Sequence, residues 1–168
     1  MYNKTMEYLW SPWRMKYIMD KEKTPQCVFC DAISHQSDEE YLILHRGKNA
    51  FIMVNRFPYT SGHLLVLPYK HVPSYEDLDQ DSRSEIMELL NLVTHALRAV
   101  YHPQGFNVGA NIGEDAGAGI APHVHFHLVP RWRGDSNFMS VTANTRVLPE
   151  EVEESYRRIK QIWDRLFG

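Results

Sequence analysis

The stretch His123-Val124-His125-Phe126-His127-Leu128-Val129 carries a histidine at every second position. A β-strand points successive side chains to opposite faces, so in a strand the three imidazoles share one face and the apolar residues between them enter the core. A glycine-rich loop, Gly113 to Gly119, precedes this stretch closely. The pattern therefore predicts a half-buried strand that presents a wall of three histidines.

Three imidazoles beside a glycine loop favour chemistry at phosphorus. Imidazole is largely neutral near pH 7 and is nucleophilic, and the phosphoramidate that it forms is reactive enough to be resolved by water or another acceptor. His125, in the middle, is the natural nucleophile. The glycines let backbone N–H groups approach anionic oxygens closely. Two plainer alternatives are histidines that only hydrogen-bond or bind a metal at the sheet surface, and glycines that only form a wide turn.

Composition limits the class of protein. A chain of 168 residues that is 43% hydrophobic is long enough for one compact domain and too short for two ordinary ones. Its 18 basic and 21 acidic residues are well mixed along the chain, so no broad positive field for nucleic acid is predicted. No signal peptide or apolar run long enough to span a membrane is recognisable, and the default compartment is the cytoplasm.

The rest of the chain predicts an α+β fold with a mainly antiparallel sheet and helices packed on one side. Apolar residues at three- and four-residue spacing indicate a long helix from Asp79 to Tyr101, and Pro149-Glu150-Glu151 begins an amphipathic C-terminal helix that ends near Phe167. Besides the histidine strand, the expected strands are Tyr41 to His45 and Ala50 to Asn55, which form a hairpin, then His63 to Pro68 and Phe106 to Asn111.

These motifs resemble the histidine-triad (HIT) family. His123 to Val129 has its alternating histidine pattern, and Ser61 to Pro68 is similar to its second landmark, a strand that begins with Gly-His. The resemblance runs from about Cys27 to Arg131, which implies a single HIT domain over 1–168, with an N-terminal arm (1–26), a HIT core (27–131) and a C-terminal extension with a helix (132–168). Leu9 to Arg14 and Pro130 to Phe138 are similar to the branch of bacterial diadenosine tetraphosphate phosphorylases and Fhit-type hydrolases.

The resemblance assigns roles to individual residues. It implies that His125 becomes nucleotidylated and that His127 contacts the α-phosphate. His123 belongs to the same catalytic group, as does His63, which matches the landmark histidine behind the nucleophile. It also implies that Asn55 meets the ribose, since a neutral amide is well suited to hydrogen-bonding hydroxyl groups.

The same resemblance places the α-phosphate on the glycine loop. Asn111 matches the asparagine before that loop, and Gly117, Ala118 and Gly119 are the loop residues expected at the phosphate. Many family members have a glutamine four residues before the first triad histidine, where this chain has Gly119. That departure resembles the phosphorylase branch, in which phosphate can replace water as acceptor, and a smaller side chain leaves room for this anion.

Cys27 and Cys30, the only cysteines, form a C-x-x-C pair. In a reducing compartment such a pair indicates metal binding or redox chemistry, although two partly buried thiols are also compatible with it. No thioredoxin-like context surrounds the pair. The family resemblance implies a structural zinc held by Cys27, Cys30, His71 and His123, a two-sulfur, two-nitrogen set that suits tetrahedral zinc.

The predicted function is cleavage of dinucleoside polyphosphates such as diadenosine tetraphosphate through a nucleotidyl-histidine intermediate, by phosphorolysis or hydrolysis. The alternatives are hydrolysis of adenosine phosphoramidates and non-catalytic nucleotide binding. The expected partners are a small nucleotide substrate and a second copy of the chain, since family members are usually homodimers; nucleic acid and membranes are not expected. Trp10, Trp13 and Trp132 could stack on a base but more often anchor packing or an interface.

Overall fold

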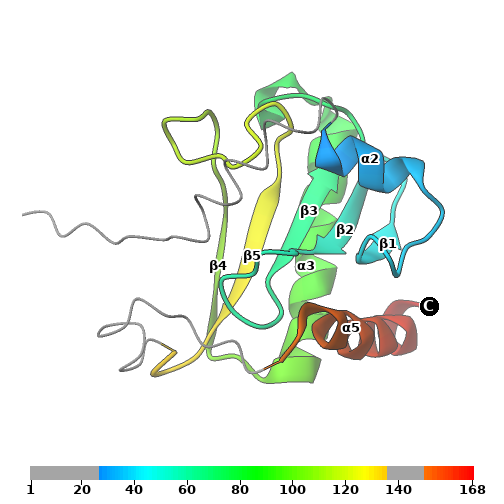
Figure 1. Cartoon of the computed structure of the whole chain (residues 1–168), viewed down its shortest axis with the longest axis vertical. Coiled ribbons are helices and arrows are strands. Elements are labelled where there is room, and N and C mark those ends of the chain that lie inside the picture. Colours follow the sequence, from blue (N-terminus) through cyan, green and yellow to red (C-terminus); the bar gives the residue numbers. More distant parts are fainter. Residues whose placement is uncertain (1–26, 136–149) are drawn as a thin grey trace, which may run out of the picture.

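The computed structural model describes residues 27–135 and 150–168. The helices are α2 (Val28–Ser34), α3 (Gln80–Tyr101) and α5 (Val152–Phe167), with a short 3-10 helix, η2 (Tyr75–Asp77). The strands are β1 (Ile43–Arg46), β2 (Ala50–Val54), β3 (Leu64–Pro68), β4 (Gly105–Ala110) and β5 (Phe126–Arg131). All neighbouring strands pair antiparallel in the order β1-β2-β3-β5-β4, which confirms the α+β class (Figure 1).

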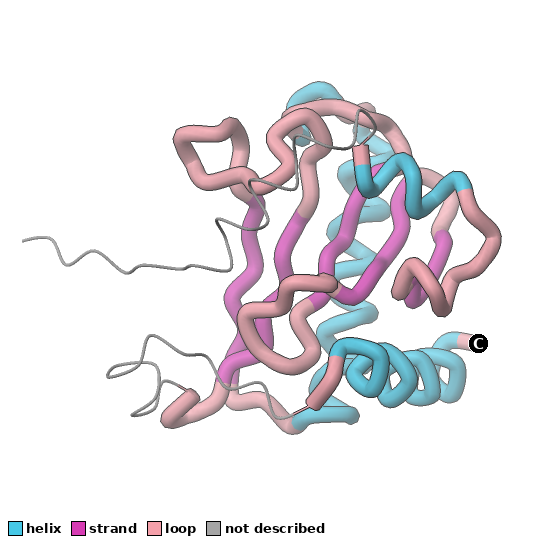
Figure 2. The backbone as a smooth tube through the Cα atoms, in the orientation of Figure 1, coloured by secondary structure: helices cyan, strands magenta, loops and turns pink. Residues whose placement is uncertain are grey.

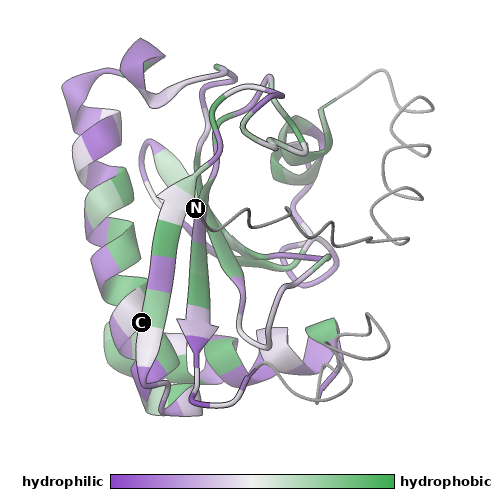
Figure 3. Cartoon of the chain, turned by 90° about the vertical axis from the view of Figure 1, so that its left-hand side faces the viewer, coloured by the Kyte–Doolittle hydropathy of each residue, from purple (hydrophilic) through white to green (hydrophobic). Residues whose placement is uncertain are grey.

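One face of the sheet packs against α3 and α5 (Figure 2). The main core lies here, because alternate residues of the strands meet the apolar stripe of α3, which includes Ile86, Val93 and Leu97. Ile159 and Trp163 of α5 belong to the same cluster. Hydrophilic residues of α3 lie on the side away from the sheet (Figure 3), as expected of an amphipathic helix.

The opposite face carries a second, smaller core, in which Phe29 of α2 packs on strand residues such as Ile43 and Leu65. The prediction that helices pack on one side is therefore wrong for α2. Seven residues are too few to establish an apolar period, so the sequence gave no signal for this helix, and its buried residues, Phe29 and Ala32, indicate that tertiary packing holds it.

Most predicted elements are confirmed with small shifts at their ends. The long helix begins one residue later than predicted, since Asp79 is its N-cap and accepts from the Ser82 N–H, and His102 ends it in the left-handed conformation. The C-terminal helix begins at Val152, after Glu151 as N-cap, rather than at the predicted Pro149. The N-terminal arm lies outside the described residues, as do Trp10 and Trp13.

The histidine strand is the main correction. Regular pairing starts at Phe126, so His123 and His125 precede β5, and the strand continues to Arg131. The approach bends away from β3 because the Val124 N–H donates to the Val72 carbonyl at 2.8 Å. The predicted alternation nevertheless holds, since Val124 and Leu128 are buried in the main core with Phe126 packed against it. Among the described helices, none is long and apolar enough to cross a lipid bilayer.

Candidate active site

His125 is held by the backbone of its own segment. Its Nδ1 lies 2.9 Å from the His123 carbonyl oxygen. A carbonyl only accepts, so Nδ1 carries the proton, and in a neutral imidazole the lone pair is then on Nε2. The side chain is 5% exposed, and the Phe29 ring packs against it at a centroid distance of 5.1 Å. The structure thus fixes one tautomer of His125.

His63 and His127 form a second unit. The Tyr59 backbone N–H donates to Nδ1 of His63 at 3.0 Å, so His63 carries its proton on Nε2, which lies 2.9 Å from Nδ1 of His127. His127 therefore accepts at Nδ1 and presents an Nε2–H. The landmark histidine was predicted behind the nucleophile; its hydrogen bond goes to His127 instead, although His127 and His125 are ring neighbours at 4.9 Å.

The predicted nucleotide-binding residues lie around this unit. The Asn55 amide nitrogen is 3.3 Å from Nδ1 of His63, and its oxygen accepts from the Phe57 N–H. In the glycine loop, Asn111 Nδ2 donates to the Gly117 carbonyl at 3.3 Å. The N–H groups of Gly117 and Ala118 donate to loop carbonyls, which gives the loop a defined turn. Gly113 and Gly117 of this loop have positive φ, which glycine adopts without steric cost.

Burial keeps the triad uncharged. Desolvation lowers the pKa of His123 to about 4, and His71 and His125 nearby lower it further against the hydrogen bond to Pro68. Desolvation and then the neighbouring His125 lower the pKa of His127 to about 4. Burial also lowers the pKa of His125, partly opposed by the bond to the His123 carbonyl. All three imidazoles are therefore neutral at pH 7, as a histidine nucleophile must be.

The four predicted metal ligands come together. Four potential ligand atoms, the sulfurs of Cys27 and Cys30 and one ring nitrogen each of His71 and His123, lie within 4.8 Å of one another. Nδ1 of His123 lies 3.5 Å from the Cys27 sulfur and 3.6 Å from the Cys30 sulfur, and Nδ1 of His71 lies 3.2 Å from the Cys30 sulfur. Tetrahedral zinc with ordinary bond lengths places sulfur and nitrogen ligands about 3.6 Å apart, so these three sulfur–nitrogen pairs already lie close to the spacing that such an ion requires.

His123 joins this cluster to His125, the predicted nucleophile. Its Nε2–H donates to the Pro68 carbonyl at 3.0 Å, which leaves Nδ1 facing the two sulfurs, while its own carbonyl holds His125. Burial and the neighbouring Cys27 thiol raise the pKa of Cys30 to about 11, as expected for two thiols that share a site without a cation. A cation there would favour the thiolate forms.

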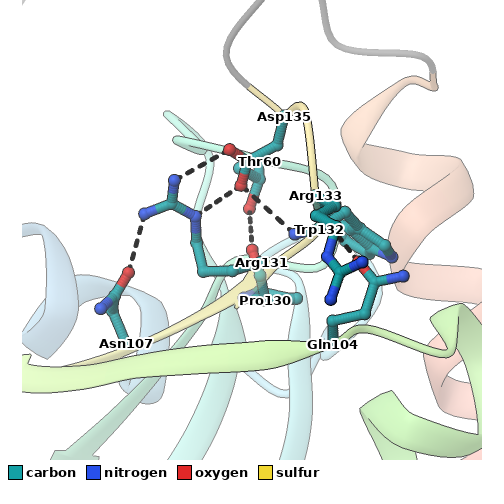
Figure 4. A network of polar contacts seen from close by, with 8 residues as sticks. All are labelled: Thr60, Gln104, Asn107, Pro130, Arg131, Trp132, Arg133 and Asp135. Atoms are coloured by element: carbon teal, nitrogen blue, oxygen red, sulfur yellow. Dashed lines mark hydrogen bonds and ion pairs between the residues drawn. The ribbon is translucent and has the colours of Figure 1, made fainter.

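The end of β5 is tied down by a polar network (Figure 4). Arg131 donates to both carboxylate oxygens of Asp135 and, through Nη1, to Asn107 on β4 at 2.9 Å. Thr60 Oγ1 donates to the Pro130 carbonyl at 3.2 Å, which connects the β2–β3 turn to β5. The Trp132 ring packs on the Tyr101 ring, and its Nε1–H donates to the Tyr101 carbonyl. Of the roles considered for Trp132, base stacking or packing, the structure shows packing.

Sequence reasoning missed two residues beside the site, Phe29 and Tyr59. Phe29 packs on the rings of both His123 and His125. Tyr59 contributes an amide to His63 and packs its ring on His63 and His127. Both are adjacent to motif residues, but only the three-dimensional arrangement shows where their rings lie.

An antiparallel α+β sheet with alternating buried histidines beside a glycine loop defines a class of nucleotide-acting proteins, and known proteins place the chain within it. Residues 36–134 match the model of the HIT domain. An AP-4-A phosphorylase of Mycobacterium tuberculosis is 36% identical over 168 residues, 95% of this chain and 86% of the relative. A bis(5'-nucleosyl)-tetraphosphatase [asymmetrical] of Schizosaccharomyces pombe is 32% identical over 93 residues, 55% of this chain and 50% of its own. The chain belongs to the HIT family.

Solved structures agree with this assignment. A Zn-bound histidine triad family protein from Mycobacterium smegmatis superposes with a TM-score of 0.67 at 27% identity, covering 84% of this chain and 95% of its own. A histidine triad nucleotide-binding protein from Sulfolobus tokodaii has a TM-score of 0.67 at 26% identity, covering 83% of this chain and 93% of its own. The HIT fold predicted from sequence is confirmed.

Proposed function

We propose that this protein cleaves dinucleoside polyphosphates, such as diadenosine tetraphosphate, through a nucleotidyl intermediate on His125. The observation that carries the proposal is the 2.9 Å bond from Nδ1 of His125 to the His123 carbonyl, because it leaves the Nε2 lone pair for attack. The similarity to an AP-4-A phosphorylase over almost the whole chain supports the substrate class.

The first step forms a bond between His125 Nε2 and the α-phosphorus and breaks the bond from that phosphorus to the bridging oxygen. The leaving polyphosphate, ATP in the case of diadenosine tetraphosphate, takes the bonding pair. The phosphorylated imidazole keeps its Nδ1 proton and becomes cationic, and the His123 carbonyl stabilises that charge. In this proposal the Nε2–H of His127 and the glycine loop hold the α-phosphate, and Asn55 holds the ribose.

The second step returns His125 to its neutral form. An oxygen of phosphate or water attacks phosphorus and expels the imidazole, giving ADP with phosphate or AMP with water, and the surplus proton of water leaves to solvent. The small residue Gly119 beside the triad supports phosphate as acceptor, because it leaves room for an anion where a longer side chain would stand.

Product analysis tests this proposal. Purified protein is incubated with diadenosine tetraphosphate in water enriched in heavy oxygen, with and without phosphate, and the products are identified by mass spectrometry. We expect ADP and ATP only when phosphate is present. Labelled AMP without phosphate would identify a hydrolase, and the absence of any nucleotide product would refute the substrate class.

The variant His125→Ala tests the covalent route directly. It should lower turnover by at least about 10⁴-fold, because the covalent route is lost, while nucleotide affinity stays within a few-fold. Intact-protein mass spectrometry should detect an AMP adduct on the wild type and none on the variant. Unchanged turnover would refute the role of His125.

We further propose that the four-residue cluster holds a structural zinc ion. Two thiols and two imidazoles at tetrahedral spacing support the choice of metal, and the four protein ligands leave no open position for substrate. Bound zinc would supply a fixed anchor for the segment that carries His125. Elemental analysis should find about one zinc per chain, with loss in Cys30→Ser; a metal-free wild type purified without chelator would refute the assignment.

The homodimer and the cytoplasmic location also remain proposals, as does the division of 1–168 into arm, core and extension. The sheet order leaves β4 at an edge, and Val108 on it is 55% exposed, which supports a partner strand there. Metal-competent thiols fit a reducing compartment. Light scattering of the full chain tests the dimer, and a monomer at micromolar concentration would refute it.

A further inference from the structure

Tyr59 packs beside the pair of histidines formed by His63 and His127. Its ring centroid lies 4.6 Å from that of His63 and 5.8 Å from that of His127, and its plane is only 18° from the His127 ring. His63 is fully buried, whereas Tyr59 is 43% exposed. The tyrosine ring therefore packs against both histidines while part of its own surface reaches solvent.

The turn that carries Tyr59 connects β2 and β3 (Figure 1), and hydrogen bonds hold it on both sides. Before it, the Phe57 N–H donates to Asn55 Oδ1 at 2.9 Å; after it, Thr60 Oγ1 donates to the Pro130 carbonyl at 3.2 Å. Tyr59 itself donates its backbone N–H to His63. A ring on so constrained a backbone has a defined place, and this makes it suitable for orienting a neighbour.

We propose that Tyr59 is a positioning residue for His127: its amide sets the tautomer of the histidine pair, and its ring keeps water from the pair's solvent side, so that the Nε2–H of His127 stays directed at the α-phosphate. The catalytic meaning of this assignment rests on the proposed function. The assignment of structure and tautomer does not, and it can be measured in the free protein.

The two contributions of Tyr59 separate cleanly. The amide survives any substitution other than proline, whereas Tyr59→Ala removes only the ring. Water then reaches Nδ1 of His127 and competes with His63 for it, and the desolvation that lowers the pKa of His127 is partly lost. Desolvation is the larger of the two causes that lower the pKa of His127, and the neighbouring His125 is the smaller. The release from desolvation should therefore dominate.

The first measurement is nitrogen-15 NMR of the histidine rings in the full chain without nucleotide. The wild type should show His127 protonated on Nε2 and titrating near pH 4. Tyr59→Ala should titrate about one pH unit higher and lose the fixed tautomer, whereas Tyr59→Phe should match the wild type. Phe57→Ala, which removes an exposed aromatic ring two residues away, is the matched control and should match it too. A Tyr59→Ala spectrum identical to that of the wild type would overturn the proposal.

The second measurement is steady-state cleavage of diadenosine tetraphosphate. Tyr59→Ala should lower kcat about tenfold with KM within twofold and move the acidic limb of the kcat profile upward with the His127 titration. Tyr59→Phe should restore both. A rise in KM alone would overturn the proposal, since the ring would then contact substrate rather than position His127. An inactive wild type would refute the proposed function, and the NMR measurement would still decide the role of Tyr59.

Discussion

Helix α2 should depend on the metal cluster for its order. It has seven residues, too few for a stable isolated helix, and ordering them costs about 10 kcal/mol of conformational entropy. Burial of Phe29 and Ala32 contributes about 3 kcal/mol. Arg46 donates to the carbonyls of Ile33 and His35, which adds about 3 kcal/mol, and the hydrogen bonds within the helix add about 3 more. Without metal, the free energy of ordering α2 is therefore within about 2 kcal/mol of zero.

Metal binding changes that balance because Cys27 caps α2 and Cys30 lies in its first turn. A metal present at a thousand times its dissociation constant adds about 4 kcal/mol, equivalent to about a thousandfold in the opening equilibrium. Chelator treatment should therefore raise amide exchange in 28–35 by up to about a thousandfold, while α3, which has no ligand, keeps its protection.

Hydrogen–deuterium exchange with mass spectrometry measures this effect on the as-purified and the chelator-treated protein, with metal content checked by elemental analysis. His71→Ala, which removes a ligand outside α2, should give an intermediate result. If α2 exchanges equally slowly in a preparation shown to be metal-free, the energetic argument for metal-dependent order is wrong.

Three further predictions concern stability. Glu85 accepts two backbone N–H groups in the β1–β2 turn at 2.6 and 2.8 Å, so Glu85→Gln should lower Tm by about 3–6 °C by calorimetry, and an unchanged Tm would contradict this clamp. Burial raises the pKa of Glu150, but bonds from Tyr101, Ser155 and Arg158 outweigh it, and the net pKa lies below the ordinary 4.5. The contribution of Glu150 to stability is thus fully present above pH 4.5 and is lost as the pH falls through the lower pKa of the folded state. The difference in Tm between the wild type and Glu150→Gln should therefore shrink on acidification, and a constant difference would contradict this linkage. Gly62 has φ of 73°, and a Cβ there would lie 2.8 Å from the Tyr101 ring, so Gly62→Ala should cost about 2–3 kcal/mol in denaturant unfolding, and a neutral result would refute the steric argument.

Much of the fold follows from local patterns in the sequence. The period of the α3 stripe and the alternation around the triad were sufficient to predict which residues face the core. The clustering of the four predicted metal ligands was also expected from sequence, because the spacing of known family members fixes which residues to choose. The ends of elements were less predictable: hydrogen bonds from caps and neighbouring loops decide them, as the Val124–Val72 bond does before β5.

The parts that could not be predicted depend on contacts between distant segments. Helix α2 has no period of its own, and its formation depends on packing against the sheet. The family pattern places His63 on a strand, but only the fold shows that its Nε2 meets His127 rather than His125. The ring of Tyr59 has no sequence signal at all, since turn tyrosines are common and the pattern gives no direction for the side chain.

Substitutions of His123 are easily misread in mutational studies of this site, because its side chain and its backbone have different roles. Its side chain belongs to the cluster that we propose holds zinc, while its backbone oxygen, which every substitution retains, holds His125, the proposed nucleophile. A variant at this position would thus keep the chemical partner of His125 and lose only the anchor that places it. Loss of activity in such a variant would show that the segment carrying His125 has moved. If a second change restored the position of that segment and the activity returned, the role of His123 would be structural rather than chemical.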